Sequence, residues 1–121
     1  MIDGTHVDQY GHVNYKAIAT VLEPFQDELL ARQETSFELI ESEMSLRSFV
    51  KKLEITWHRE LKQGEECVVL TRLELGNTSM KFFQEIHVLD DLAATLFMVV
   101  VLVDSEGKSA PIPPRLREML F

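Results

Sequence analysis

The stretch VDQYGHVNY, residues 7–15, gathers the groups of this chain that could do chemistry. A carboxylate at Asp8, a glycine at Gly11, an imidazole at His12 and an amide at Asn14 stand close together. A carboxylate can serve as a general base or a nucleophile, and an imidazole can transfer protons. Apolar residues at helical spacing follow at once, so we expect these groups at a helix N-terminus. Unpaired N–H groups and the positive end of the helix dipole stabilise negative charge there.

Each of these residues also has a purely structural interpretation. Asp8 could cap a turn or the helix through its carboxylate oxygens, and taken alone that role is the commoner one. His12 could brace the loop through its ring nitrogens instead of transferring a proton. Asn14 is better explained as the N-cap of the helix than as a catalytic group.

The segment from Asn14 to about Arg32 is predicted to form a mostly buried helix. Its apolar residues recur with a period near 3.6 and form a wide stripe. Pro24 removes one hydrogen bond of this helix and is expected to kink it. The stripe consists of Ala17, Ile18, Val21, Leu22, Phe25, Leu29 and Leu30.

The rest of the chain is strand-like. Residues 1–7 have room for only a short strand, and residues 33–43 for a loop with a helical turn. Four strands are predicted after them, separated by polar turns, and a short helix ends the chain. In the first strand we expect Phe49 to share a face with Leu53, Ile55 and Trp57. Tight turns imply an antiparallel meander, and a helix packed on it gives an α+β fold. The strand segments are residues 48–58, 67–75, 79–88 and 93–103.

Composition narrows the class of protein. A chain of 121 residues with 45% hydrophobic residues fits one domain with a real core. The net charge of −8 argues against nucleic acid or an anionic membrane as a partner. The single cysteine, Cys67, and the lack of a signal peptide predict a reducing, cytoplasmic location. The histidines show no zinc spacing, so we expect no metal, and no cofactor motif is present.

The motif D-x-x-G-H-V-N, placed between a short strand and a long helix, resembles that of hotdog-fold acyl-CoA thioesterases. The likeness is greatest to the 4-hydroxybenzoyl-CoA thioesterase-like family. Three later stretches agree with it: TWHRELKQGEE, NTSMKFFQEI and VVVLVDSEGKSAPIPPRLRE. The resemblance implies a hotdog fold, an antiparallel sheet of about five strands wrapped around one long helix. It implies a single domain spanning residues 1–121.

The resemblance also implies roles for individual residues. Asp8 would activate water or attack the thioester directly, and the sequence does not decide between the two. Backbone amides near Gly11, His12 and Val13 would polarise the carbonyl as an oxyanion hole. Glu23, further along the helix, would orient water or a partner loop, or would form a plain salt bridge. Asn14 belongs to the catalytic motif. The residues expected to bind the substrate, including the phosphates of CoA, are Tyr10, Arg59, Ser79 and Lys81.

The resemblance makes acyl-CoA the expected substrate and a homodimer or homotetramer the expected assembly, formed by pairing sheet edges. Two alternatives stay open. The chain could hydrolyse an acyl group held on acyl carrier protein, although its acidic charge disfavours docking that acidic carrier. It could also bind acyl-CoA without cleaving it. The retained carboxylate at Asp8 favours catalysis. The acyl group itself stays undetermined.

Overall fold

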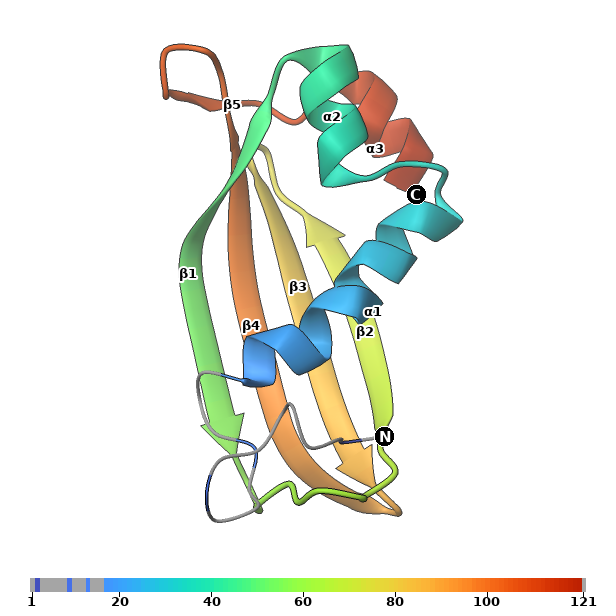
Figure 1. Ribbon diagram of the computed structural model, residues 1–121. Coiled ribbons are helices and arrows are strands. Elements are labelled where there is room, and N and C mark those ends of the chain that lie inside the picture. The colour runs from blue at the N-terminus through green and yellow to red at the C-terminus, as the bar shows by residue number, and fades with distance from the viewer. Residues whose placement is uncertain (1, 3–8, 10–12, 14–16, 121) are drawn as a thin grey trace.

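A computed structural model of the chain describes residues 2, 9, 13 and 17–120. Its helices and strands follow one another in the expected general order, a long helix before four long strands (Figure 1). They are α1 (Ile18–Arg32), α2 (Phe37–Met44), β1 (Arg47–Trp57), β2 (Val68–Leu75), β3 (Ser79–Val88), β4 (Asp91–Val103), β5 (Ser109–Ala110) and α3 (Pro114–Leu120).

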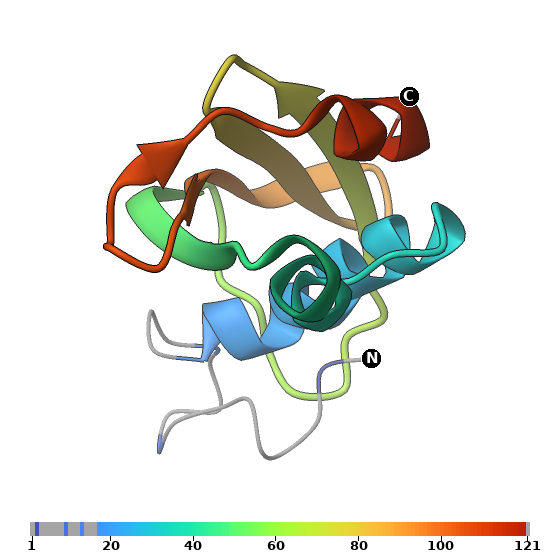
Figure 2. The same cartoon turned by 90° about the horizontal axis from the view of Figure 1, so that it is seen from above.

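The strands form one five-stranded antiparallel sheet in the order β1-β4-β3-β2, with the two-residue β5 pairing with β4. Helix α1 crosses one face of this sheet, and α2 and α3 lie near one end of it (Figures 1 and 2). The expected α+β architecture, an antiparallel sheet against one long helix, is confirmed.

The expected continuous meander is wrong at its first turn. Strand β1 pairs with β4, not with β2, so residues 58–67 carry the chain across one end of the sheet. Only β2, β3 and β4 form a meander. The crossing segment is fixed to β4, since the backbone N–H groups of His58 and Arg59 both donate to the Ala93 carbonyl. This order places β4 between β1 and β3, which explains why its sequence is so apolar.

The predicted faces of β1 need a correction as well. Leu53, Ile55 and Trp57 pair with inward-facing residues of β4, as expected for one face. Phe49, however, pairs with Val101 and lies on the opposite, outer face. A β-bulge between Val50 and Lys52 adds one residue to β1 and so exchanges the faces on either side of it. The alternation of side chains therefore reverses within the strand.

Helix α1 begins four residues later than predicted. Ala17 occupies its N-cap position and makes no side-chain capping bond, so Asn14 is not the N-cap of this helix. The helix continues through Pro24. Proline has no N–H to donate to the Thr20 carbonyl, and Thr20 is exposed, so water can reach it there. Helix α2 has the cap that α1 lacks, because the Ser36 hydroxyl accepts a hydrogen bond from the Leu39 N–H.

The core lies between α1 and the inner face of β3 and β4. In β3 every second residue, from Met80 to Val88, is buried against the helix, while the residues between them are half-exposed. The α1 side chains that complete this layer include Ile18, Leu22 and Leu30. Phe82 is among the largest side chains that are fully enclosed. The side chains of β3 therefore alternate between the core and the outer face of the sheet.

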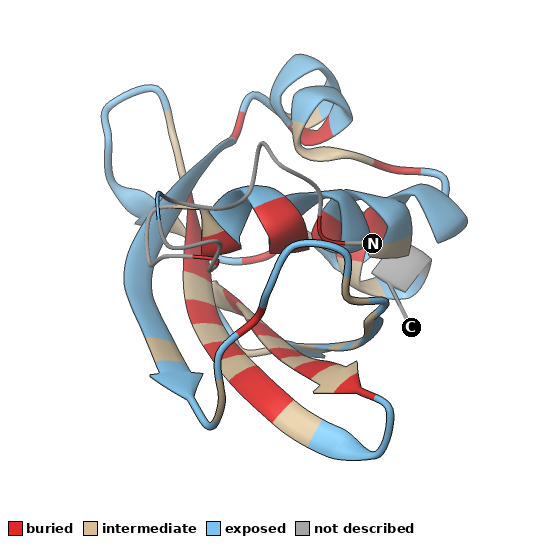
Figure 3. Ribbon diagram, turned by 60° about the horizontal axis from the view of Figure 1, so that its bottom comes forward, coloured by how far each residue is buried: buried red, intermediate tan, exposed pale blue. Residues whose placement is uncertain are grey.

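Strand β1 is exposed along almost its whole length (Figure 3). Its inward-facing residues Val50 and Leu53 are 50% and 47% exposed, although both are apolar. Phe49 on the outer face is 59% exposed. Because β1 is also an edge strand, an open backbone edge and exposed apolar side chains coincide there.

Within residues 17–120, no helix combines the length and the apolar character that crossing a bilayer requires.

Candidate functional site

Most of the N-terminal motif lies outside the described residues. This holds for Asp8, Tyr10, Gly11, His12 and Asn14, so their expected roles stay predictions. Val13 is described, and it is buried.

The backbone amide of Val13 is already paired. Its N–H donates to the Leu61 carbonyl at 2.8 Å, in the segment that crosses from β1 to β2. A donor occupied in this way is not free for a substrate oxygen, so Val13 does not fit the expected oxyanion hole. Ile2 is fixed to the same crossing segment, because it exchanges backbone hydrogen bonds with Gly64 and Glu65. Ile2 and Val13 are therefore both hydrogen-bonded to the segment that crosses from β1 to β2.

A cavity of about 310 Å³ opens between α1 and the inner face of β1. Its walls are mostly apolar where β1 and β4 supply them and mostly polar where α1 supplies them. The apolar lining residues are Ala19, Phe37, Val50, Leu53, Leu96, Met98 and Val100, and the polar ones are Glu23, Gln26, Asp27 and Ser48. We call this the helix-side cavity. An apolar chamber with a few polar groups is typical of small-molecule sites.

Among the predicted site residues that the structure describes, Glu23 is the one that lines the helix-side cavity. It is exposed, and it forms no ion pair within the described part of the chain, which does not support the plain salt bridge that the sequence left open. Asp27 lies one helical turn further along the same side of α1 and lines the same cavity. Two carboxylates thus stand beside an apolar chamber.

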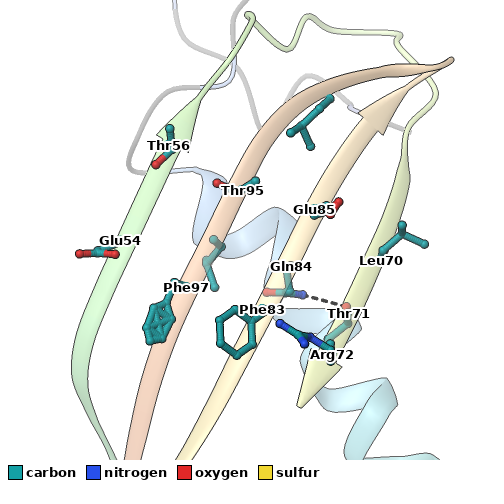
Figure 4. Close-up of a pocket in the computed structure, with 12 residues that line it drawn as sticks. Glu54, Thr56, Leu70, Thr71, Arg72, Phe83, Gln84, Glu85, Thr95 and Phe97 are labelled. Carbon is teal, nitrogen blue, oxygen red and sulfur yellow. Dashed lines mark hydrogen bonds between the residues drawn. The ribbon is translucent and has the colours of Figure 1, made fainter. Parts of the chain in front are cut away.

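A second cavity, about 510 Å³, lies on the outer face of the sheet, with α1 behind the strands (Figure 4). Phe83 and Phe97 stack there at a centroid distance of 4.9 Å. Arg72 lies 4.4 Å from the Phe83 ring, and Lys52 lies 5.7 Å from the Phe97 ring. Each cation also pairs with a carboxylate on its own strand. The charges of Arg72 and Lys52 are therefore each offset by a carboxylate, and the sheet separates this surface from α1.

The remaining predicted binding residues do not gather at the helix-side cavity. Ser79 and Lys81 lie on β3 at outward-facing positions, where Lys81 is opposite Glu74. Arg59 lies in the crossing segment and is held at 2.5 Å by Glu65. Because that carboxylate neutralises its charge, Arg59 is a poor candidate for binding a phosphate. The basic entrance expected for CoA is thus not assembled by these three residues.

Cys67 lies half-buried just before β2. Burial is the largest effect on this thiol, and it raises the pKa of Cys67 above its ordinary value. The thiolate therefore forms at higher pH than in a free cysteine. We expect iodoacetamide at pH 7.5 to alkylate Cys67 more slowly than in the same protein unfolded in urea. Mass spectrometry would follow the reaction, and equal rates in the two states would contradict this expectation.

Among the described residues, no group of three His, Cys, Asp or Glu side chains lies close enough to hold a metal ion. A small ligand could instead be held by the described residues of either cavity. Those of the helix-side cavity can enclose an apolar group and can accept hydrogen bonds from a donor that the ligand carries.

Comparisons with solved structures agree on the fold. A protein from Aquifex aeolicus superposes with a TM-score of 0.89 and 19% identity, over 99% of this chain and 94% of that one. A 1,4-dihydroxy-2-naphthoyl-CoA thioesterase from Synechocystis gives 0.89 and 16%, over 99% and 90%. A Thermus thermophilus thioesterase complexed with coenzyme A and Zn gives 0.82 and 24%, over 98% and 86%. These likenesses show a shared fold, which confirms the hotdog architecture.

The sequence comparisons decide the family. None of the curated proteins matches the chain. The family model of the thioesterase-like superfamily matches residues 4–120, nearly the whole chain. The expectation drawn from the N-terminal motif is thereby confirmed, and the chain belongs to the thioesterase-like superfamily, a family of thioester hydrolases.

Proposed function

We propose that this protein is an acyl-CoA thioesterase, which cleaves a thioester to a free acid and CoA. The observation that carries the proposal is Asp8 within the D-x-x-G-H-V-N motif of a chain from the thioesterase-like superfamily. A similar fold binds coenzyme A in the Thermus thermophilus thioesterase. A protein that only binds acyl-CoA has no need of a carboxylate beside the thioester.

In the proposed reaction Asp8 acts as the base or the nucleophile. As a base it takes a proton from water while the water oxygen attacks the thioester carbon. The C–S bond then breaks and the sulfur leaves as the CoA thiolate, which takes up a proton. The carbonyl oxygen gains negative charge on the way, and backbone amides near Gly11 and His12 would stabilise it. The Val13 amide is left out of this set because Leu61 occupies it.

The helix-side cavity is the proposed site of the acyl group. Its lining combines apolar side chains of β1 and β4 with the α1 residues that follow the motif in sequence. Glu23 faces this cavity without an ion pair among the described residues, which fits a role in orienting water or substrate. The outer-face cavity is the weaker candidate, since the whole sheet stands between it and α1.

We further propose that the protein is a homodimer in which two β1 edges meet. Phe49, Val50 and Leu53 expose apolar surface along the one long edge strand next to the helix-side cavity. A second copy placed there would cover these side chains and pair the open backbone groups. It would also close the cavity on its exposed side. The single-domain organisation and cytoplasmic location stay predictions.

The direct test is a thiol-release assay over a panel of acyl-CoA esters with aromatic, short and medium acyl groups. We expect at least one ester to release CoA at a rate above spontaneous hydrolysis. If acyl-CoA raises the melting temperature but no thiol appears, the protein is a binding module. If only acyl groups on acyl carrier protein are cleaved, the carrier in the proposal is wrong.

A further inference from the structure

The helix-side cavity lies against the core on one side and reaches exposed side chains of β1 on the other. On the core side, Gln26 of α1 donates from Nε2 to the Gln84 Oε1 atom on β3 at 2.8 Å. Gln84 donates from its own Nε2 to the Leu22 carbonyl at 3.2 Å, so these bonds tie α1 to the sheet. On the β1 side, Val50 and Leu53 line the cavity and are about half exposed. A chain that covers β1 therefore adds to the wall of the cavity.

Symmetry restricts how two β1 edges can pair in the proposed dimer. An antiparallel pair of identical strands has its two-fold axis perpendicular to the joined sheet, so the inner face of one copy continues into the inner face of the other. Residues that lie opposite each other in an antiparallel pair share a face, and neighbouring residues of a strand do not. The axis therefore cannot pass between two alternating residues. One residue of β1 lies on the axis, opposite its own copy, and this residue fixes the register.

The length of β1 and its bulge leave two candidates for the residue on the axis. Residues 47–50 and 52–57 pair with β4, and Lys51 is the extra residue of the bulge, without an opposite residue. If Lys52 or Leu53 lies on the axis, all but one of the pairing residues of β1 also find an opposite residue in the second copy. Any other choice leaves more of the backbone edge unpaired, which is unfavourable.

Charge decides between these two residues. Lys52 and Glu54 lie on the outer face, opposite Val99 and Phe97 of β4, and both side chains are more than half exposed. With Lys52 on the axis, two ammonium groups lie directly opposite each other, which destabilises a strand pair. With Leu53 on the axis, each Lys52 lies opposite the partner's Glu54, and the two Leu53 side chains meet on the inner face. The second arrangement pairs opposite charges and covers an apolar side chain.

We propose that two copies of this chain pair along β1 with Leu53 on the two-fold axis and each Lys52 opposite the partner's Glu54. The inference rests on the homodimer of the proposed function and adds its register. Each Lys52 then lies between two carboxylates, because its ammonium group is already 3.2 Å from Glu54 of its own strand. The four charges alternate in sign around the axis.

This register brings residues of the partner subunit to the helix-side cavity. On the inner face, the partner's Ile55 lies opposite Val50, and the partner's Trp57 lies opposite Ser48, because the bulge keeps these pairs on one face. Val50 and Ser48 line the cavity. Each cavity therefore borders two apolar side chains of the partner subunit, and the site is complete only in the dimer.

Single cysteines locate the axis. Leu53→Cys, Lys52→Cys and Glu54→Cys are each made with Cys67→Ser, oxidised mildly with copper phenanthroline and followed on a non-reducing gel. A thiol on the axis lies opposite its own copy, within reach of a disulfide, while the copies of Lys52 or of Glu54 are displaced by two residues along the strands. We expect Leu53→Cys to cross-link roughly tenfold faster than the other two. Leu70→Cys, on the edge strand β2, is the control and should not cross-link.

Charge reversal tests the contact between Lys52 and Glu54. Lys52→Glu and Glu54→Lys each place like charges opposite each other, so the dissociation constant of either homodimer should rise about tenfold in sedimentation. An equimolar mixture of the two variants forms heterodimers in which every opposed pair is again of opposite charge. The mixture should associate as tightly as the wild type. The matched controls are Arg72→Glu and Glu74→Arg, which break the corresponding ion pair on β2 and should leave the dimer unchanged.

Each outcome decides the inference. Fastest cross-linking at another residue of β1, or charge variants whose homodimers are as tight as the wild type, would overturn the register. A wild-type protein that is monomeric at micromolar concentration would overturn it as well. Neither measurement needs a substrate, so the proposed function fails separately. A dimer with this register that releases no thiol from any ester would support the inference and reject the enzyme.

Discussion

Asp8→Asn is expected to fold normally and to lose roughly 10²–10⁴ of its turnover, the usual size for removing a general base. Asparagine keeps the shape of aspartate and its hydrogen-bonding capacity for capping a turn. It cannot take a proton from water, and it is no nucleophile. The measurement is kcat in the thiol-release assay, with circular dichroism to verify the fold. Asp90→Asn, in the exposed turn between β3 and β4, is the matched control and should retain full activity.

Near wild-type turnover of Asp8→Asn on its best ester would remove Asp8 from the mechanism. For the active enzyme, a single turnover in H₂¹⁸O separates the two remaining routes. A general base delivers the ¹⁸O atom to the acid product. A nucleophile forms a mixed anhydride first, and attack of water on its aspartyl carbon leaves ¹⁸O in Asp8 itself. Mass spectrometry of the acid product and of the protein shows which of them carries the ¹⁸O atom.

Leu53→Lys is expected to convert the proposed dimer into a monomer and to reduce activity with it. Leu53 is 47% exposed on the inward face of β1. In a two-fold symmetric interface the substitution places two like charges close together, which weakens the free energy of dimerisation by several kcal/mol. Since about 1.4 kcal/mol changes an equilibrium constant tenfold, the dissociation constant should rise a hundredfold or more. Sedimentation at micromolar concentration would measure it.

Leu70→Lys is the matched control for this prediction. Leu70 is an equally exposed leucine, at 55%, but it lies on β2 at the other edge of the sheet. It should leave the assembly and the activity unchanged. A wild-type protein that is already monomeric and active at micromolar concentration would contradict the shared edge. So would a monomeric but fully active Leu53→Lys variant.

The parts of the fold that follow from local pattern were predictable. Strand β3 alternates cleanly because every second residue faces α1, and this period of two is visible in the sequence. The bulge in β1 is not visible, since Val50 and Lys52 suit either face of a strand. The pairing of β1 with β4 depends on the whole sheet, and a polar segment with Gly64 looks the same whether it turns back or crosses over.

The site was predictable in part. Glu23 was expected to orient water or a partner loop, and it lines the helix-side cavity, while the role itself stays a prediction. The importance of Gln26 was missed, although the sequence holds a signal for it. Gln26 lies four residues from Leu22 and four from Leu30, on the buried stripe of α1. A polar residue on such a stripe must find a partner, and the partner in β3 is far away in sequence.

The bond from Gln84 to the Leu22 carbonyl also limits how α1 can sit on the sheet. Contacts among leucine, isoleucine and valine are nearly indifferent to a small slide or roll of a helix, because dispersion forces have little direction. A directed amide is not indifferent. Moving α1 by one turn would separate Gln26 and Gln84 from their partners inside the core. The pair therefore favours one position of α1 on the sheet, and with it one shape of the helix-side cavity.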